Sequence, residues 1–595
     1  MLVPGLPPSC PHSNYLPDHP RLSSEDVVSV TPETDYERKD EKLSIFGEQN
    51  PSHEFDKALE SINRNKKVWL FTFFLLVSMP GILNSIHISV YVFFTGTPEH
   101  WCTIPQLENA GWTPAEIRNF TVPRDSKDIL RSCGYYDWNY TEIAAMGYNA
   151  ASAMIAPLPP VKQCLKRSFL DAEKGKSIES EWDLVCDRAV LKPSVQGIFA
   201  VGKFFGALFF GCVADKYGRK TSFFWASCVY LVAIPASSLT HSFAMFLLSR
   251  LAIGMAGSGA YESVFTILTE TTTGNARTMM GTLTNVSYPI GMIILATVAY
   301  FNRYWRTLQL YLSAFMVLLI VDCWFVKESP KWLFAEGREE EAWAILKRID
   351  DTIDVPKKRR DSRTSHKKKA DHMPWYEHVL DLIKKFTSLF SEAELCVRIL
   401  VCYFAWTVSA LAYYLVALSG DNFAANKYLF IALNGVCEVP SYFLPIPLLR
   451  LYGRKATAMM LYFCSGMAQL SILFFNRSQV NWVTAVALFG RFTGSAVFGS
   501  LILQTTELFP TAQRNSAVGS SLMIAQVGSF VAPFLVASVG VERWYVPSVI
   551  CGVLSLCCGI LFCIIPETTG KPLYNTSKEI PPEDKVSFAQ CCRFK

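Results

Sequence analysis

The chain carries two copies of one series of charged residues, and the copies lie about 240 residues apart. Matching residues are separated by 235 to 241 positions, and in each copy a glutamate stands seven residues before an arginine. Each member lies in an apolar stretch or at its end, which predicts a duplicated bundle of membrane helices, an architecture typical of transporters. The first copy is Gly218-Arg219-Lys220, Arg250, Glu270, Arg277 and Glu328, and the second is Gly453-Arg454-Lys455, Arg491, Glu507, Arg514 and Glu567.

The composition supports a membrane protein. Half of the residues are hydrophobic, 18% are charged and 13% are aromatic, a balance more apolar than that of most soluble proteins. Twelve apolar segments are long enough to cross about 30 Å of hydrocarbon. We therefore predict an all-α membrane protein with twelve transmembrane helices in two pseudo-symmetric six-helix bundles. The segments cover roughly 68–95, 191–212, 221–240, 243–268, 278–301, 306–326, 396–418, 427–449, 456–475, 482–506, 515–538 and 545–565.

These segments divide the chain into seven regions. In order, we expect a disordered cytoplasmic tail, the first transmembrane helix, a large extracellular loop, five helices, a basic cytoplasmic loop, six helices and a cytoplasmic tail. The leader contains no apolar run, so no cleavable signal peptide is expected. The bounds of the seven regions are 1–66, 67–95, 96–190, 191–326, 327–395, 396–565 and 566–595.

The placement of Lys and Arg predicts the orientation. Eight basic residues lie between Lys357 and Lys369, and short loops rich in Lys and Arg stay in the cytoplasm. Counting crossings from this loop places both termini in the cytoplasm and residues 96–190 outside. Between membrane spans, such a run is better explained by topology or by contact with anionic lipids than by nucleic acid. Membrane lipids are therefore expected partners, and nucleic acid is not.

Residues 96–190 carry two features of an extracellular segment. The runs Asn119-Phe120-Thr121 and Asn139-Tyr140-Thr141 match the N-glycosylation pattern, which is used on lumenal or extracellular surfaces. The segment also holds an even number of cysteines, which predicts two disulfides in any of three pairings. The alternative is four free thiols. These cysteines are Cys102, Cys133, Cys164 and Cys186.

Charged residues at the segment ends predict a gate on the cytoplasmic side. Gly218 permits a tight turn, and Asp215 can pair with a nearby arginine or with the positive end of a helix dipole. Such a cluster would hold the two bundles together when the inner side is closed. The alternative is that the basic turns merely follow the positive-inside rule, but their recurrence favours a gate. The expected gate residues are Asp215, Arg219, Glu270, Arg277, Glu328, Arg454, Glu507, Arg514 and Glu567.

Several runs resemble one known family. The turn that ends in Asp215-Lys-Tyr-Gly218-Arg219-Lys220 resembles that of the major facilitator superfamily, although Arg450 stands where the second copy usually keeps an acid. Residues 55–575 further resemble the organic cation, carnitine and organic anion transporters. The resemblance implies an alternating-access fold and movement of small charged organic molecules. The runs that carry it are Glu181-Trp-Asp-Leu-Val-Cys-Asp187, Arg277-Thr-Met-Met-Gly281, Glu328-Ser-Pro-Lys-Trp-Leu333, Glu507-Leu-Phe-Pro-Thr-Ala-Gln-Arg-Asn515 and Pro566-Glu-Thr-Thr-Gly-Lys-Pro-Leu573.

The resemblance also implies where a substrate binds. Glu438 matches the central-cavity acid of the family, and a charge at membrane depth is functional by default because it is costly. We expect its carboxylate to pair with a substrate ammonium; the alternative is a structural pair with Arg491. Tyr442 stands where anion-transporting relatives place a lysine. Gln526 stands where cation transporters have Asp and where anion and carnitine relatives have Arg.

Aromatic residues complete the expected site. Trp406, Tyr413 and Tyr414 lie in the seventh segment, and rings near a carboxylate often surround an ammonium group. The alternative is that these rings only pack or face lipid. Arg250 is expected to be structural, and Glu262, which follows three glycines in the fourth segment, is expected to serve coupling or packing.

The combined features predict a carrier of small organic cations or zwitterions of carnitine or biogenic-amine size. We expect it in the plasma membrane, working by alternating access either alone or coupled to Na⁺ or H⁺. The alternatives are an organic anion transporter and a non-transporting receptor or scaffold. The sequence contains no nucleotide-binding glycine-rich loop or metal-ligand spacing, so we expect neither an enzyme nor a cofactor or metal.

Overall fold

The computed structural model describes most of the chain beyond the leader. Two compact units are distinguished, Met1–Lys57 and Ala58–Lys595. The second unit contains the membrane bundle and the region between its first two spans. The described residues are 51–96, 98–124, 131–154, 158–170, 175–353, 383–384, 386–423, 426–539, 543–571, 574 and 577–586.

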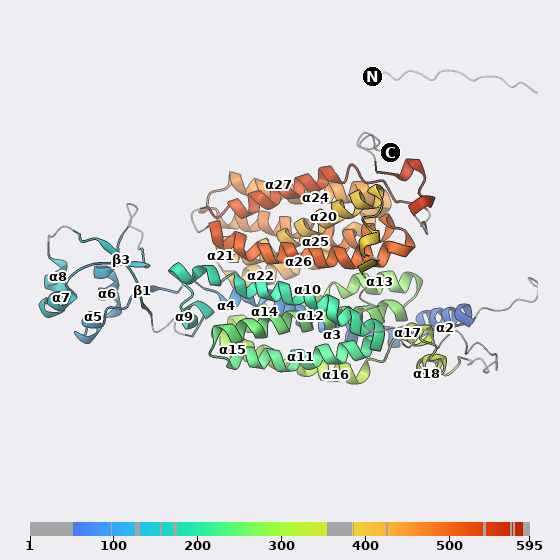
Figure 1. Cartoon of the computed structure of the whole chain (residues 1–595), viewed down its shortest axis with the longest axis horizontal. Helices are drawn as coiled ribbons and strands as arrows, with labels where there is room; N and C mark the ends of the chain where they lie inside the picture. Colours follow the sequence, from blue (N-terminus) through green and yellow to red (C-terminus); the bar gives the residue numbers. More distant parts are fainter. Residues whose placement is uncertain are drawn as a thin grey trace, which may run out of the picture. The chain divides into compact units, whose positions relative to one another are not determined.

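The first half of the bundle is the lower group of long helices in Figure 1. Its three central helices, α10, α11 and α12, pack against one another, and α3 packs against α14 and α12. The helices of this half are α3 (Lys67–Ser89), α4 (Tyr91–Phe94), α10 (Ser194–Tyr217), α11 (Arg219–Leu239), α12 (Phe243–Thr271), α13 (Gly274–Thr284), α14 (Ser287–Phe301), α15 (Trp305–Ala314) and α16 (Val317–Phe325).

The second half repeats this arrangement above the first in Figure 1. Helix α20 packs against α26, and α24 packs between α25 and α27. The two halves meet where α10 packs against α26 and where α14 packs against α22. The elements of the second half are α20 (Ala393–Leu418), α21 (Gly420–Phe423), α22 (Lys427–Ser441), α23 (Pro445–Leu451), α24 (Gly453–Ser471), η4 (Ile472–Phe474), α25 (Val480–Leu508), α26 (Thr511–Val539) and α27 (Val546–Leu561).

These helices confirm an all-α membrane protein. In the described part of the chain, 11 helical stretches are long and apolar enough to cross a membrane, and they coincide with the first eleven expected segments. The twelfth segment, expected at 545–565, contains α27, an apolar helix of 16 residues that is shorter than a usual span. Helix α27 packs inside the second half, so its position fits the repeat. Because it is shorter than a usual span, the count of twelve spans stays a prediction.

Glycines set the close spacing of α10 and α12. A Cβ atom added to Gly202 would lie 2.3 Å from the backbone oxygen of Leu251, and one added to Gly254 would lie 2.3 Å from that of Phe199. No larger side chain fits at either position without a shift of the backbone. Small residues allow such contacts in membranes, where van der Waals packing drives helix association. The contact fixes two helices that line the cavity described below.

The described residues of 96–190, here called the loop domain, form a small folded unit at one end of the bundle (Figure 1). Strand β1 (His100–Cys102) pairs antiparallel with β4 (Arg167–Phe169), and β2 (Gly134–Tyr136) pairs antiparallel with β3 (Val161–Gln163). The loop domain has a hydrophobic core of its own around Leu107. Its helices are α5 (Pro105–Asn109), α6 (Pro114–Thr121), α7 (Tyr140–Met146), α8 (Tyr148–Ser152), α9 (Ile178–Trp182) and η2 (Cys186–Leu191).

Short helices also lie outside the bundle. Helices α17 (Pro330–Ala335) and α18 (Glu339–Ile349) begin the expected basic loop, while η5 (Ser577–Glu579) and η6 (Pro582–Asp584) lie in the C-terminal region. The basic run Lys357–Lys369 lies outside the described residues.

The expectation of a disordered leader does not hold for the 15 residues of α2 (Pro51–Asn65). Phe55, Leu59 and Ile62 recur at helical spacing, and Leu59 and Ile62 are buried. The Nδ2 atom of Asn63 donates to Thr273 Oγ1 at 3.0 Å. An apolar face and a polar anchor therefore order this segment, although it has no long apolar run. Residues 1–50 lie outside the described part.

Candidate functional site

A cavity of about 220 Å³ lies between the two halves. Its polar lining from the first half comes from α3, α10, α12, α14 and the junction of α13 with α14. Its polar lining from the second half comes from α20, α25, α26 and the end of α22. These polar residues are Asn84, Lys203, Ser258, Tyr261, Glu262, Asn285 and Tyr288 from the first half, and Tyr413, Tyr414, Tyr442, Ser495, Gln526 and Ser529 from the second.

Four of the predicted substrate-site residues line this cavity, namely Tyr413, Tyr414, Tyr442 and Gln526. The amide oxygen of Gln526 is buried and has no hydrogen-bond partner among the described residues. A buried polar atom without a partner is costly, so this oxygen is available to accept a hydrogen bond from a solute or from water.

The expectation of a cavity-facing Glu438 does not hold. Its Oε2 atom accepts a hydrogen bond from Arg491 Nη2 at 2.8 Å, and its Oε1 atom accepts one from the Tyr442 hydroxyl at 2.7 Å. The side chains of Glu438 and Arg491 are 0% and 1% exposed. The guanidinium also lies 3.3 Å from the centroid of the Tyr413 ring. A buried carboxylate needs a fixed partner, and Arg491 supplies it, so the alternative of a structural ion pair describes this structure.

Trp406 is also placed away from the cavity. Its side chain is fully buried, its indole Nε1 donates to Thr505 Oγ1 at 3.1 Å, and its ring meets the Phe498 ring edge-on at 5.0 Å. Helix α20 therefore directs Trp406 toward α25. Trp406 and Tyr413 lie on the same helix, but the neighbouring helices decide which of its side chains reach the cavity.

Two charged cavity residues were not assigned to the site from the sequence. Glu262 was expected to serve coupling or packing, and Lys203 was not singled out. Glu262 Oε1 accepts a hydrogen bond from Ser258 Oγ at 2.6 Å. The Lys203 side chain makes no hydrogen bond or ion pair with any described residue. A lysine inside the apolar segment 191–212 was the available signal, because charges at membrane depth mark functional sites.

The first Gly-Arg-Lys turn is held by Glu328. Glu328 Oε1 accepts hydrogen bonds from the backbone amides of Arg219 at 2.9 Å and Lys220 at 3.1 Å, at the positive N-terminus of α11. Gly218 has a φ of 105°, and a Cβ atom there would lie 2.3 Å from Glu328 Oε2. Glycine is therefore required both by the backbone conformation and by the approach of the carboxylate.

The second turn repeats this arrangement around Glu567. Its Oε1 atom accepts from the Arg454 amide at 2.9 Å, and its Oε2 atom accepts from the Lys455 amide at 3.0 Å. Gly453 has a φ of 82°, and a Cβ atom there would lie 2.9 Å from Glu567 Oε2. Burial opposes ionisation of Glu567, but hydrogen bonds from Thr569 and from these amides outweigh it and lower the pKa of the carboxyl.

The arginine of each turn pairs with the glutamate of the next long helix. Arg219 Nη2 lies 3.1 Å from Glu270 Oε1 and 3.3 Å from Asp215 Oδ1. In the second copy, Arg454 Nη2 lies 3.0 Å from Glu507 Oε1. Every ion pair between described residues at this end of the bundle, which we call the motif end, stays within one half. Among the described residues, no ion pair at the motif end joins the two halves, and the cluster expected when the inner side is closed stays a prediction.

Arg277 and Arg514 do not pair with the glutamates seven residues before them. Arg277 Nε donates to the Thr272 carbonyl oxygen at 3.0 Å, and Arg514 Nε and Nη2 have no hydrogen-bond partner among the described residues. Between described residues, Glu507 and Glu567 contact Arg454 and make no ion pair with Arg514. The helix ends direct these two glutamates toward Arg454 instead.

The two halves contact each other at the opposite end, next to the loop domain, which we call the loop end. Lys427 Nζ donates to the Thr95 carbonyl oxygen at 3.2 Å. The Tyr428 ring stacks on Phe93 at 5.3 Å and meets Tyr300 edge-on at 5.9 Å. These contacts connect α22 with α4 and α14, so side chains join the two halves at the loop end.

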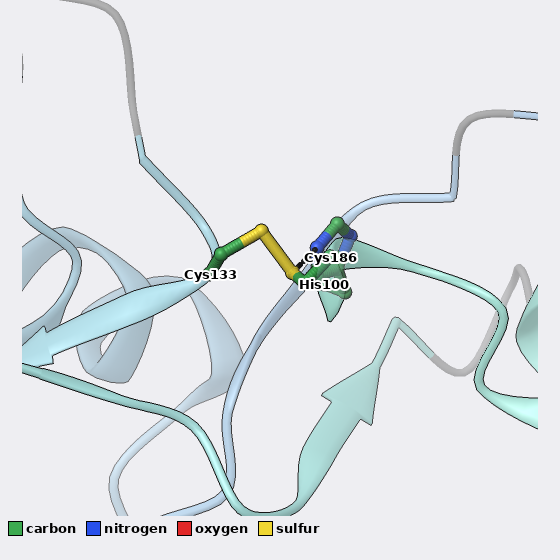
Figure 2. A group of neighbouring side chains, drawn as sticks. All are labelled: His100, Cys133 and Cys186. Atoms are coloured by element: carbon green, nitrogen blue, oxygen red, sulfur yellow. Dashed lines mark hydrogen bonds between the residues drawn. A yellow bond between two sulfur atoms is a disulfide. The ribbon is translucent and has the colours of Figure 1, made fainter. Parts of the chain in front are cut away.

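The loop domain confirms two disulfides. Cys102 bonds to Cys164 and Cys133 bonds to Cys186. Figure 2 shows the second disulfide with His100 beside it, where His100 Nε2 lies 3.6 Å from Cys186 Sγ. Since both sulfur atoms are used in the disulfide, this group offers no thiolate to a metal ion.

Other loop-domain residues explain two sequence features. Asn119 and Asn139 are both exposed, as a glycosylated residue must be, and their modification stays a prediction.

Glu181 Oε2 accepts a hydrogen bond from Trp305 Nε1 at 2.8 Å, and Arg306 Nε donates to Glu181 Oε1 at 2.9 Å. Glu181, from the Glu181–Asp187 run, therefore fastens the loop domain to α15.

Comparison with known proteins agrees with this geometry. The chain matches the family described as "Sugar (and other) transporter" over residues 141–579. The "Organic cation transporter protein" of Drosophila melanogaster is 28% identical over 512 residues, which cover 85% of this chain and 90% of the relative. "Solute carrier family 22 member 16" of Xenopus laevis is 31% identical over 518 residues, covering 83% and 88%. Human "Organic cation/carnitine transporter 2" is 28% identical over 519 residues, covering 84% and 90%.

A solved structure supports the fold. The inward-open xylose transporter XylE from E. coli superimposes with a TM-score of 0.54 at 14% identity, covering 84% of this chain and 98% of XylE. The superposition agrees with the fold described above. The chain therefore belongs to the sugar and other transporter family and, within it, to the organic cation, carnitine and organic anion transporters of the major facilitator superfamily.

Proposed function

We propose that this membrane transporter carries small organic cations or zwitterions across the plasma membrane. The observation that carries the proposal is the cavity between the halves, which is lined by five tyrosines and by two ionisable side chains of opposite charge. Tyrosine faces attract ammonium groups, and relatives of this chain are named organic cation and organic cation/carnitine transporters. An organic anion is the second candidate class, because Lys203 is a cation in the same lining.

Alternating access is supported by the asymmetry between the two ends of the bundle. Contacts at the loop end join α22 to α4 and α14, whereas the ion pairs between described residues at the motif end remain inside each half. Rocking of one half against the other would open the loop end and bring the two motif-end clusters together. With the loop domain outside and both termini in the cytoplasm, the present state would face inward. Either Na⁺ or H⁺ is a candidate coupling ion.

Uptake measurements test the substrate class. Cells that express the full chain would be given labelled organic cations, zwitterions and anions while the membrane potential is clamped and external Na⁺ is exchanged. We expect saturable uptake of cations or zwitterions that depends on surface expression. A chain that reaches the surface and moves none of the three classes would contradict the proposal, and uptake of anions alone would favour the second candidate.

Arg219→Ala tests the gate. Arg219 holds Glu270 and Asp215 in the first cluster, so its loss should slow uptake while surface expression stays near normal. The matched control is Arg450→Ala, because Arg450 is exposed and makes no ion pair with a described residue. Equal uptake rates in the two variants would refute a gating role for Arg219.

Glycosylation tests the orientation. If the loop domain is extracellular, glycosidase treatment of the wild type should lower its apparent mass on a gel. Replacing both Asn119 and Asn139 by Gln should lower the mass to the same extent. No change of the wild type on treatment would contradict the proposed orientation or the use of these acceptors.

A further inference from the structure

The cavity has a distribution of charge that the family resemblance did not imply. Among the cavity-lining residues that the structure describes, Lys203 and Glu262 are the two that carry an ammonium or a carboxyl group. Both come from the first half, Lys203 from α10 and Glu262 from α12. The close glycine contacts between these helices place the two residues on one wall. The charges of the cavity therefore lie on a single, rigid side.

Neither charge is neutralised by the protein. Lys203 makes no hydrogen bond or ion pair with the described residues, and Glu262 receives one hydrogen bond, from the Ser258 hydroxyl at 2.6 Å. Lys203 and Glu262 form no ion pair with each other. Isolated charges at membrane depth are costly and normally pair with each other or with a transported solute. Here each charge is available to a solute.

The opposite wall is neutral. The acid of the second half, Glu438, is already paired with Arg491 and lies outside the lining. Tyr413, Tyr442 and Gln526 present rings, a phenol and an amide to the cavity instead. A charged solute therefore finds its counter-charges on α10 and α12, and finds aromatic and hydrogen-bonding surface on the second half.

We propose that Lys203 and Glu262 bind the two ends of a zwitterionic solute, Lys203 its carboxylate and Glu262 its ammonium. The proposal rests on the proposed transport function and assigns its selectivity to one wall of the cavity. A zwitterion satisfies both side chains at once, because they are separate and face the same space. A solute with only a positive charge leaves Lys203 unpaired and is repelled by it. A solute with only a negative charge leaves Glu262 unpaired and is repelled by it.

Three solutes of nearly equal shape test the proposal. They are 4-(trimethylammonio)butanoate, its primary amide, which keeps only the positive charge, and 5,5-dimethylhexanoate, which keeps only the negative charge. In competition with a transported labelled solute, the wild type should bind the zwitterion about tenfold more tightly than either analogue, a difference that corresponds to about 1.4 kcal/mol. Lys203→Met should abolish the preference over the amide, and Glu262→Gln should abolish the preference over 5,5-dimethylhexanoate.

Matched controls separate this role from a general effect of charge. Lys216→Met removes a lysine from the same helix outside the cavity, and Glu339→Gln removes an exposed glutamate. Both should keep the wild-type order of affinities. Lys203→Arg keeps the positive charge and should keep the preference for the zwitterion. This variant distinguishes lost recognition from lost folding if Lys203→Met does not reach the surface.

The outcomes also separate this proposal from the proposed function. Suppose that the wild-type protein moves organic cations but binds the amide with the same affinity as the zwitterion. This result would overturn the assigned roles of Lys203 and Glu262 and leave the transport function intact. The assigned role of Lys203 would also be overturned if Lys203→Met reached the surface normally and still preferred the zwitterion over the amide. Wild-type protein that transports no member of the wider solute panel would instead contradict the proposed function.

Discussion

Breaking the Glu438–Arg491 pair should destabilise the protein before it alters substrate choice. The two charged groups lie 2.8 Å apart and are almost completely buried. At an effective dielectric constant of about 20, their mutual attraction is about 6 kcal/mol. Much of it is offset by the loss of hydration, but removing one partner leaves the other buried and unpaired, which costs about 3–5 kcal/mol. Glu438→Gln and Arg491→Met should each destabilise the fold by this amount.

A double-mutant cycle distinguishes this ion pair from a substrate site. The melting temperature of purified protein would be measured in detergent by fluorescence-detected gel filtration. Each single variant should melt well below the wild type, while the double variant should recover part of the loss because no unpaired charge remains. Glu341→Gln is the matched control, because Glu341 pairs with Arg338 at 2.6 Å on the exposed surface. That pair should contribute little to stability, because both groups are exposed to solvent.

One result would refute this reasoning. If Glu438→Gln melts like the wild type, shows no coupling to Arg491→Met and loses cation uptake, its carboxylate serves the substrate rather than the fold. Glu438 would then be the cavity acid, in a state in which Arg491 has moved away.

Three further results are expected. Gly218→Ala should destabilise the protein by about 1–3 kcal/mol through its positive φ and its clash with a carboxylate, whereas Gly281→Ala, with open space around it, should be neutral or slightly stabilising in melting experiments. Mass spectrometry of unreduced peptides should find Cys102 linked to Cys164; a link from Cys102 to any other cysteine would contradict the structure. The pKa of Glu567 is lowered below its ordinary 4.5 in the folded state, so its ionised form stabilises the fold above that pH. The difference in melting temperature between wild type and Glu567→Gln should be largest near pH 7 and vanish as the pH falls through the folded-state pKa; a difference independent of pH would show that ionisation is unimportant.

Local physics made the architecture predictable from the sequence alone. A membrane span needs a long apolar run, because every backbone polar group must be satisfied without water, and eleven of the expected segments are found as such helices. The duplicated turns were also visible, since Gly218 and Gly453 mark a backbone conformation that few other residues adopt. The loop domain followed from its four cysteines, although spacing alone left three pairings open.

The partners of charged side chains were decided by tertiary structure. A sequence shows that Glu438, Arg491 and Glu262 lie at membrane depth, but a helix has several faces and its rotation is set by the helices around it. Glu438 turned toward Arg491, whereas Lys203 and Glu262 turned toward the cavity. Likewise Trp406 and Tyr413 share a helix, yet only Tyr413 reaches the cavity. The sequence determined which charges enter the membrane, and only helix packing decided which of them remain available to a solute.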